Sequence, residues 1–423
     1  MAGDAYEDDR RQRTRDQIAL IRSAREGSVG WDSIDEADFT YLVDPSHVLL
    51  RNAEDAVRVG DALERTDEFE GRGDLVESLF PAVARYRLPT RRDSGATDVD
   101  RALELIAADP SIDLVTPEHL LHICSNGSCC PATEPAETGL DGPWPRMTPD
   151  PDAGDGVRVL VIDTGIHLPA TTDGRTPWLD GVSGDAEPNG PILDPYAGHG
   201  TFAAGVVRCR APKATVEVLR FTVDASGAVS EIEIADLLGR ALESADPPDV
   251  ISLSAGTYTR LHRPLLAFQV LWDNTLQRMP DTVVVAAAGN DSRYAPFWPA
   301  AFDWAVGVGS LDRDDRISSY SNFGPSADVF ALGRNHVNAF PDGSYVCNET
   351  PDKGDQREFG TGLARWSGTS FSTPMVAGMI AAEISGDRTH RRKTPRQARD
   401  SVLSQAGPRS DQVRGPYRAL PIP

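Results

Sequence analysis

Four short runs of apolar, β-rich residues occur after residue 156, and they limit the fold more than any other feature. Stretches with helical spacing lie between them, for example at 231–245 and 264–279. Continuous apolar strands that alternate with helices are typical of a parallel sheet covered on both faces. We therefore predict an α/β domain over 156–387, with a doubly wound, mainly parallel sheet. Its strands include VRVLVI (157–162), TVEVLR (215–220), VISLS (250–254) and TVVVAAA (282–288).

The rest of the chain has other patterns. Residues 36–123 read strand–helix–strand–helix–strand, which predicts a small α+β domain. Residues 1–35 form a polar leader. Residues 124–155 are rich in Pro, Gly and Cys, which is typical of a linker. Residues 388–423 are basic and contain proline, so we expect a final helix and a tail there.

The overall charge and the apolar pattern exclude several classes of protein. With 64 acidic residues against 42 Lys and Arg, the formal charge is −22. Phosphate would be repelled, which argues against a partner that is nucleic acid or an anionic membrane. No run of about 18 apolar residues is present, and the N-terminus lacks the apolar core of a secretion signal. We therefore expect a cytoplasmic protein. Five cysteines are too few for a disulfide scaffold of this length.

Asp163 follows the first strong strand directly, within Asp163-Thr164-Gly165. Functional groups of a doubly wound sheet gather beyond the carboxyl ends of its strands. An aspartate there can equally be a ligand or a helix cap. An aspartic protease would need a second such loop to pair two carboxyls. The other candidate, Asp93-Ser94-Gly95, lies in a polar stretch without an apolar strand.

Two further motifs carry chemistry. His199 lies between Gly198 and Gly200, before a run of small residues that suits a helix packed closely on the sheet. A histidine can be structural, but flanking glycines leave space around the imidazole. Ser370 precedes an apolar helix, where free N–H groups favour negative charge, as an oxyanion would require. The alternative is a simple N-cap serine.

Together the motifs VIDTGI, GHGTFAAGVV and GTSFSTPMVAG closely resemble the three signature blocks of subtilisin-like serine proteases, the subtilases. The order Asp163, His199, Ser370 is also the subtilisin order. The resemblance implies a serine endopeptidase that hydrolyses peptide or protein substrates through an acyl-enzyme. Ser370 would be the nucleophile, His199 the general base, and Asp163 the residue that orients the imidazole.

Two more segments match the family. Ser254, Ala255 and Gly256 correspond to the segment that pairs with the substrate backbone and lines the first specificity pocket. Asn290 follows Ala288 and Gly289 and resembles the oxyanion-hole residue, although a turn residue is the alternative. The small residues around both segments suggest a pocket for a medium or large apolar side chain.

The resemblance extends to regulation. The 36–123 domain resembles an inhibitory propeptide in its element order, the alternative being an unrelated accessory domain. Its release would require a cut within 124–155. A second hypothesis is a protein with an intact triad, held inactive by this domain, that acts mainly as a binding partner. The stretch 334–366 is longer than usual and could narrow the cleft, act as a flap, or form a solvated loop.

The sequence does not decide whether the protein binds a metal or whether its thiols react. Cys124, Cys129 and Cys130 could bind zinc with His122, respond to redox state, or be incidental. Subtilisin-like enzymes often bind Ca²⁺, but no clear run of ligands is present. We assign no metal-binding residues and expect that no cofactor is required.

Overall fold

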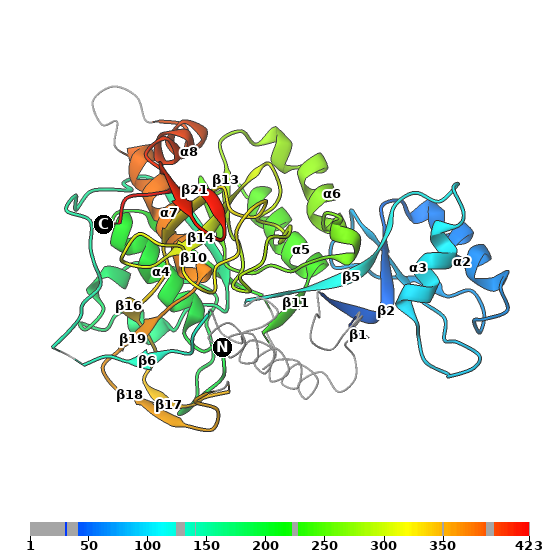
Figure 1. Cartoon of the computed structure of the whole chain (residues 1–423), viewed down its shortest axis with the longest axis horizontal. Helices are drawn as coiled ribbons and strands as arrows, with labels where there is room; N and C mark the ends of the chain where they lie inside the picture. Colours follow the sequence, from blue (N-terminus) through cyan, green and yellow to red (C-terminus); the bar gives the residue numbers. More distant parts are fainter. Residues whose placement is uncertain are drawn as a thin grey trace.

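The computed structural model describes residues 30–31, 41–123, 132–139, 141–221, 227–348, 351–385 and 393–422. Most of the predicted leader, at 1–35, lies outside the described residues. Figure 1 shows a large unit and a smaller N-terminal module (residues 41–123) beside it, joined by strand β5 (Val115–His122).

The large unit contains a nine-stranded sheet in the order β20-β21-β15-β14-β13-β12-β7-β10-β8. All neighbouring pairs are parallel except the edge pair β20–β21. The α/β fold with a mainly parallel sheet is therefore confirmed. The strands are β7 (Arg158–Asp163), β8 (Ser183–Gly184), β10 (Thr215–Arg220), β12 (Val250–Leu253), β13 (Val283–Ala287), β14 (Ala305–Leu311), β15 (Val329–Leu332), β20 (Gly407–Asp411) and β21 (Gly415–Ala419).

Helices cover both faces of this sheet because its strands are apolar on both sides. In β7, Val159 and Val161 join one buried cluster, whereas Leu160 and Ile162 join another. The first cluster includes side chains of α4 (His199–Arg210), α7 (Thr369–Ser385) and α8 (Pro395–Ser404). The second includes side chains of α5 (Glu231–Leu242) and α6 (Leu266–Asn274).

The N-terminal module has two helices packed on an antiparallel sheet in the order β5-β2-β4-β3. Asp98 caps α3 by accepting from the Arg101 N–H at 3.0 Å. The short strand β3 is absent from the sequence prediction. The sheet continues into the large unit, because β11 (Ala228–Ser230) pairs with β5. The other elements are β1 (Gly30–Trp31), β2 (Leu42–Leu50), α2 (Ala56–Glu64), β3 (Asp74–Val76), β4 (Ala84–Arg87) and α3 (Val99–Ala107).

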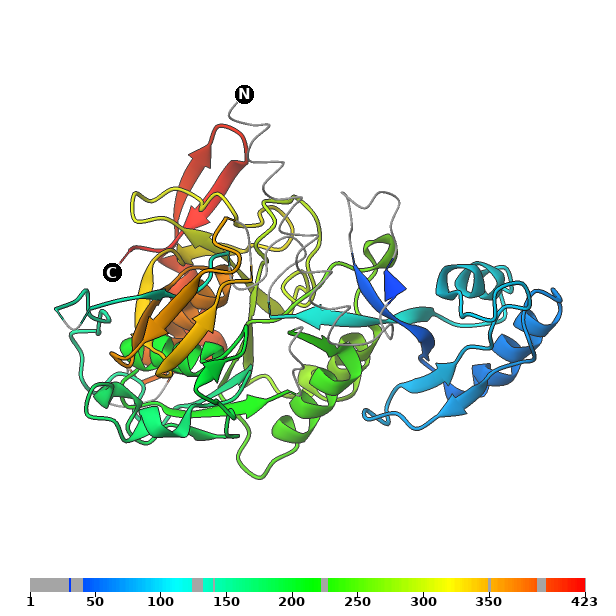
Figure 2. The ribbon, with the colours of Figure 1, turned by 90° about the horizontal axis from the view of Figure 1, so that it is seen from below.

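The stretch 334–366 is packed, not a solvated loop. It forms two hairpins, β16 (His336–Ala339) with β19 (Leu363–Trp366) and β17 (Gly343–Val346) with β18 (Gln356–Phe359). Tyr345 and Trp366 are fully buried within them. Strand β6 (Ala136–Glu137) pairs with β19, and β9 (Ile192–Leu193) pairs with β17. Figure 2 shows the hairpins beside α4. Part of the predicted 124–155 linker is thus a strand of this small sheet.

The predicted C-terminal tail is wrong beyond α8. Residues 407–419 form the β20–β21 hairpin, and β21 extends the main sheet beside β15. The Leu420 N–H donates to the Phe330 oxygen at 2.8 Å, and the Tyr417 and Phe330 rings are in edge contact. The hairpin therefore covers an edge that would otherwise expose unpaired backbone groups.

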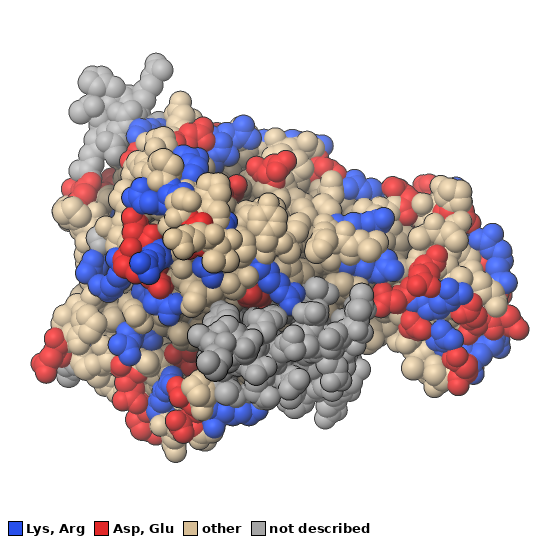
Figure 3. All heavy atoms as spheres, viewed as in Figure 1, with Lys and Arg blue, Asp and Glu red and all other residues tan. Residues whose placement is uncertain are grey.

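Charged side chains of both signs are interspersed over the face in Figure 3, including the N-terminal module. Arginine–carboxylate pairs such as Arg101–Glu68, at 2.7 Å, account for part of this pattern. Within the described ranges, none of the helices has both the length and the apolar character needed to cross a bilayer.

Candidate active site

Asp163 and His199 form a buried pair at the carboxyl edge of the main sheet. Asp163 is the last residue of β7, and His199 is the first residue of α4. The His199 Nδ1 and Asp163 Oδ1 atoms lie 2.6 Å apart. The Thr164 N–H also donates to Asp163 Oδ1, at 2.8 Å, so the carboxylate has a fixed orientation. This arrangement holds the proton on Nδ1 and presents Nε2 as the basic nitrogen.

The glycines beside His199 are required by close packing. Gly198 has φ +76°, and a Cβ there would lie 2.4 Å from Pro341 Cδ. A Cβ on Gly200 would lie 2.3 Å from the Gly165 oxygen. The Gly-His-Gly pattern thus lets α4 begin directly against the loop that carries Asp163.

Aromatic rings surround the imidazole. The Trp366 ring meets it edge-on at 5.4 Å, and the Phe371 ring lies 5.2 Å away. Trp366 comes from β19 of the insertion, so this insertion forms one wall of the site. The His199–Asp163 pair is fully buried, and exclusion of water strengthens such a charge-assisted hydrogen bond.

Ser370 is the second residue of α7 and faces a carbonyl group of the N-terminal module. Its Oγ donates to the Ile123 oxygen at 3.3 Å. Ser254 Oγ donates to the Ser370 backbone oxygen at 3.0 Å, which ties the start of α7 to the end of β12. The predicted nucleophile therefore lies beside a peptide carbonyl of its own chain.

Residues 120–123 lie between two segments of the large unit and pair with both. On one side Leu120 and Leu121 pair antiparallel with β11, and the Ile123 N–H donates to Gly227 O at 3.3 Å. On the other side His122 exchanges two backbone hydrogen bonds with Gly256, at 2.9 and 3.0 Å. This is strand addition on both edges, the manner in which a cleft binds an extended peptide. Sequence reasoning identified the 254–256 side and missed β11, since three residues before a helix give no strand signal.

Asn290 lies next to Ser370 in a turn after β13. Its Oδ1 accepts from the Thr369 N–H and hydroxyl, both at 2.9 Å. This fixes the amide so that its Nδ2 faces away from Thr369. Asn322 holds the same turn, because its Nδ2 donates to the Ala288 oxygen at 2.8 Å and its N–H to the Gly289 oxygen at 2.9 Å. A rigid donor is what stabilisation of a developing oxyanion requires.

Glu187 is a second carboxyl near the pair that sequence reasoning did not single out. Its Oε2 accepts from the Gly198 N–H at 2.8 Å and from Asn189 Nδ2 at 2.9 Å. Burial raises the pKa of Glu187 to about 7, and the nearby Asp163 charge acts in the same direction. The side chain braces the residue that precedes His199. It lies in a polar loop with no motif, which explains why it was missed.

Replacing Glu187 by glutamine is expected to remove a pH-dependent loss of stability. The folded-state pKa, about 7, exceeds the ordinary value of 4.5. The wild-type carboxyl therefore favours folding when protonated, and this advantage falls as pH rises from about 4.5 to about 7. The change in unfolding free energy relative to Glu187→Gln is at most about 3 kcal/mol. Denaturant unfolding in a Ser370→Ala background measures it. A difference in unfolding free energy between the two proteins that does not change with pH would contradict the raised pKa of Glu187. The exposed Glu54→Gln serves as the control.

Metal-ligand side chains also gather outside this site. In the part of the chain that the structure describes, Asp44, His47 and Glu118 form one such group. The Arg85 guanidinium pairs with Glu118 at 2.7 Å and Asp44 at 3.1 Å. The single Arg85 charge thus offsets part of the negative charge of these two carboxylates. The predicted thiol cluster of Cys124, Cys129 and Cys130 lies outside the described residues.

Comparison with known proteins identifies the large unit. The model of the subtilase family, peptidase S8, matches residues 154–418, more than half of the chain. Thermitase of Thermoactinomyces vulgaris is 30% identical over 249 residues, which cover 56% of this chain and 77% of thermitase. The thermophilic serine proteinase of Bacillus sp. strain AK1 is 30% identical over 247 residues, covering 56% of this chain and 54% of that protein.

A solved structure shows the same fold. The prenylagaramide maturation protease PagA superposes with a TM-score of 0.50 at 22% identity, covering 64% of this chain and 92% of that one. The matched part therefore spans about half of the Bacillus proteinase but nearly all of PagA.

Proposed function

Because this chain belongs to the subtilase family of serine proteases, we propose that it cleaves peptide bonds with the triad Asp163, His199 and Ser370. We further propose that its N-terminal module first inhibits the site and is then cut from it. The contact between Ser370 Oγ and the Ile123 oxygen, at 3.3 Å, carries both proposals. The same contact supports Ile123–Cys124 as the bond to be cleaved.

In the described structure Ser370 Oγ donates to the Ile123 oxygen and His199 Nε2 has no hydrogen-bond partner, so the first step requires the Ser370 hydroxyl to turn toward His199. His199 Nε2 takes the Ser370 proton as Oγ bonds to the carbonyl carbon of Ile123. Asp163 stabilises the resulting imidazolium across the 2.6 Å hydrogen bond. Asn290 Nδ2 and the Ser370 N–H are the donors for the oxyanion. His199 then gives its proton to the Cys124 nitrogen as the C–N bond breaks. Water hydrolyses the acyl-enzyme by the reverse proton path.

Contacts away from the cleft support inhibition by the module. His119 is buried, with its Nδ1 3.1 Å and its backbone N–H 3.0 Å from Glu231 Oε1. Arg260 pairs with Asp100 at 3.0 Å, and Arg51 pairs with Asp273 at 2.9 Å. The module is thus held at several points, so cleavage of one bond does not by itself free the cleft. These contacts also support the alternative hypothesis, in which the triad is intact but stays blocked until the N-terminal module leaves.

Self-cleavage is the test. We expect wild type to yield fragments that end at Ile123 and begin at Cys124, read by intact mass and N-terminal sequencing. Ser370→Ala should remain full-length and should not react with a fluorophosphonate. Ser372→Ala is the matched control, because Ser372 is equally buried and its hydroxyl donates to the Thr369 oxygen. If wild type stays uncut and unlabelled, the blocked protein is the better description. If Ser370→Ala is cut at the same bond, the triad assignment is wrong.

A further inference from the structure

We propose that a pocket behind the catalytic helices binds a tetrahedral oxyanion such as phosphate. The pocket lies between the segment 143–146, the end of α4, the middle of α7 and strand β16. Its volume is about 100 Å³. The polar residues that line it are Arg146, Arg210, Arg313, Asn335, His336 and Asn338. It holds none of the triad residues.

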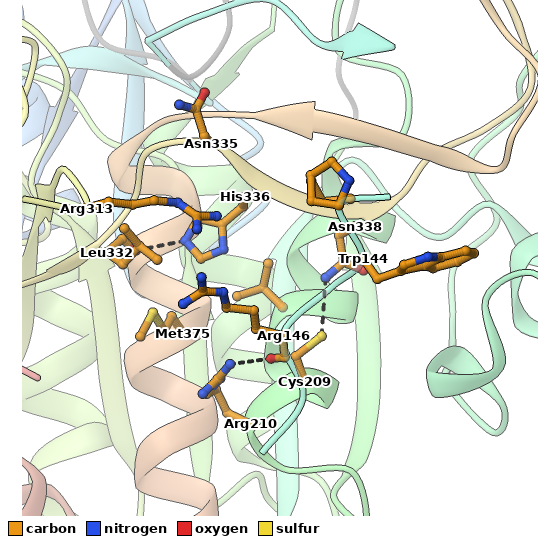
Figure 4. A pocket seen from close by; sticks show the side chains of 13 residues that line it. Trp144, Arg146, Cys209, Arg210, Arg313, Leu332, Asn335, His336, Asn338 and Met375 are labelled. Carbon is orange, nitrogen blue, oxygen red and sulfur yellow. Dashed lines mark hydrogen bonds between the residues drawn. The ribbon is translucent and has the colours of Figure 1, made fainter. Parts of the chain in front are cut away.

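The charge of this pocket is opposite to that of the protein. Three arginines line it and none of its lining residues is acidic, although the chain has a net charge of −22. In Figure 4 the guanidinium groups of Arg313, Arg146 and Arg210 lie along one side, with the His336 ring between the first two. Like charges at such a site repel one another, and a bound anion would relieve the repulsion.

Burial and the charges of neighbouring arginines both lower the pKa values of two lining groups, Arg210 and His336. Burial lowers the pKa of Arg210, and the charge of Arg146 lowers it further. Burial likewise lowers the pKa of His336 to about 4, and the charges of Arg210 and Arg313 contribute. His336 is therefore neutral at pH 7, and the arginines carry the positive charge of the pocket.

Hydrogen bonds fix the walls and leave donors for a ligand. Arg210 donates one N–H to the Arg146 backbone oxygen, and a guanidinium has five such donors. His336 Nε2 donates to the Leu332 oxygen at 2.8 Å. Asn338 Oδ1 accepts from Trp178 Nε1 at 2.9 Å, which holds that amide in place. Planar arginine forks bind oxyanions in a bidentate manner.

The size of the pocket and the helix ends narrow the choice of ligand. About 100 Å³ holds several water-sized groups, which suits a tetrahedral oxyanion, and is too small for a nucleotide or a peptide. Helix α4 ends at Arg210, and its carbonyl end disfavours an anion. Binding must therefore come from the arginine side chains. A bound oxyanion would link 143–146 to the helices that begin with His199 and Thr369.

Titration of the full-length Ser370→Ala protein with inorganic phosphate tests the site without self-cleavage. At constant ionic strength, calorimetry should give one site with a Kd below about 1 mM, and phosphate should raise the Tm where chloride does not. Arg313→Gln should weaken binding at least tenfold, since one charged partner is lost. Arg313 is exposed, so the variant should fold. Arg316→Gln, an exposed arginine three residues on, should bind like the parent.

Three results would overturn the proposal. One is the absence of saturable binding up to about 10 mM phosphate. Another is an equal effect of chloride, which would indicate screening alone. The third is an unchanged Kd in both Arg313→Gln and Arg210→Gln, which would place the ion elsewhere. Because triad chemistry plays no part in the readout, failure here and failure of the protease assignment are distinguishable.

Discussion

Replacing His199 by alanine is expected to slow self-cleavage at Ile123–Cys124 by about a millionfold. The His199 imidazole is held through Nδ1 by the buried Asp163 carboxylate, at 2.6 Å, and is the proposed base for Ser370. Loss of the base of a Ser-His-Asp triad costs about 10⁶ in rate. Asp163→Asn should cost about 10⁴, because the amide favours the wrong imidazole tautomer. The double variant should be no slower than His199→Ala, since the residues act as a unit.

The first-order rate of conversion from full-length to cut protein measures these effects. His262→Ala is the control, because His262 is exposed and lies outside the triad. It should cut at the wild-type rate. Cleavage by His199→Ala within a hundredfold of wild type would show that another group acts as the base.

Replacing Ile123 by aspartate is expected to slow self-cleavage by about a thousandfold and at the same time to open the site. The Ile123 side chain is 2% exposed and belongs to the largest apolar cluster. An unpaired carboxylate there would cost several kcal/mol, so the end of the module should leave the cleft. The carbonyl would no longer be held beside Ser370 Oγ, and the advantage of positioning would be lost.

A fluorophosphonate separates the two effects. Uncut Ile123→Asp protein should react with the probe at Ser370, because nothing covers the nucleophile. The exposed Leu75→Asp, in the same module, should cut as wild type does. Wild-type cleavage by Ile123→Asp, or an uncut variant that stays unlabelled, would contradict the assigned bond or the inhibitory role.

The main sheet and the pair Asp163–His199 were predictable because their signals are local. The predicted strands 157–162, 250–254 and 282–288 are continuous apolar runs. Their bounds agree with those of β7, β12 and β13 to within one or two residues. The triad motifs owe their residue types to close packing, as the Cβ distances at Gly198 and Gly200 show. Such constraints leave a pattern in the sequence itself.

The missed elements depend on partners far along the chain. Strand β11 has three residues and becomes a strand through β5, more than a hundred residues earlier. The hairpin at 407–419 has no alternating apolar pattern, because one strand is largely exposed and only Ala419, followed by Leu420, is buried. The hairpins of 334–366 depend on aromatic rings that pack on α4 and α7. None of these contacts leaves a short-range signal.

If the chain cuts itself at Ile123–Cys124 as proposed, strand β6 limits how far the new chain end can move. It anchors the chain on β19, and Trp366 Nε1 donates to the Thr133 oxygen at 2.5 Å. Only residues 124–131 separate Ile123 from this anchored part, so the amine released at Cys124 stays within about 30 Å of Ala132. A tether of that length keeps its end at an effective concentration on the order of millimolar. Acyl-enzyme and amine would therefore meet repeatedly, and resealing of the bond would compete with hydrolysis. Activation would then depend on how fast the module dissociates. A cleaved chain whose module stays bound would remain inactive.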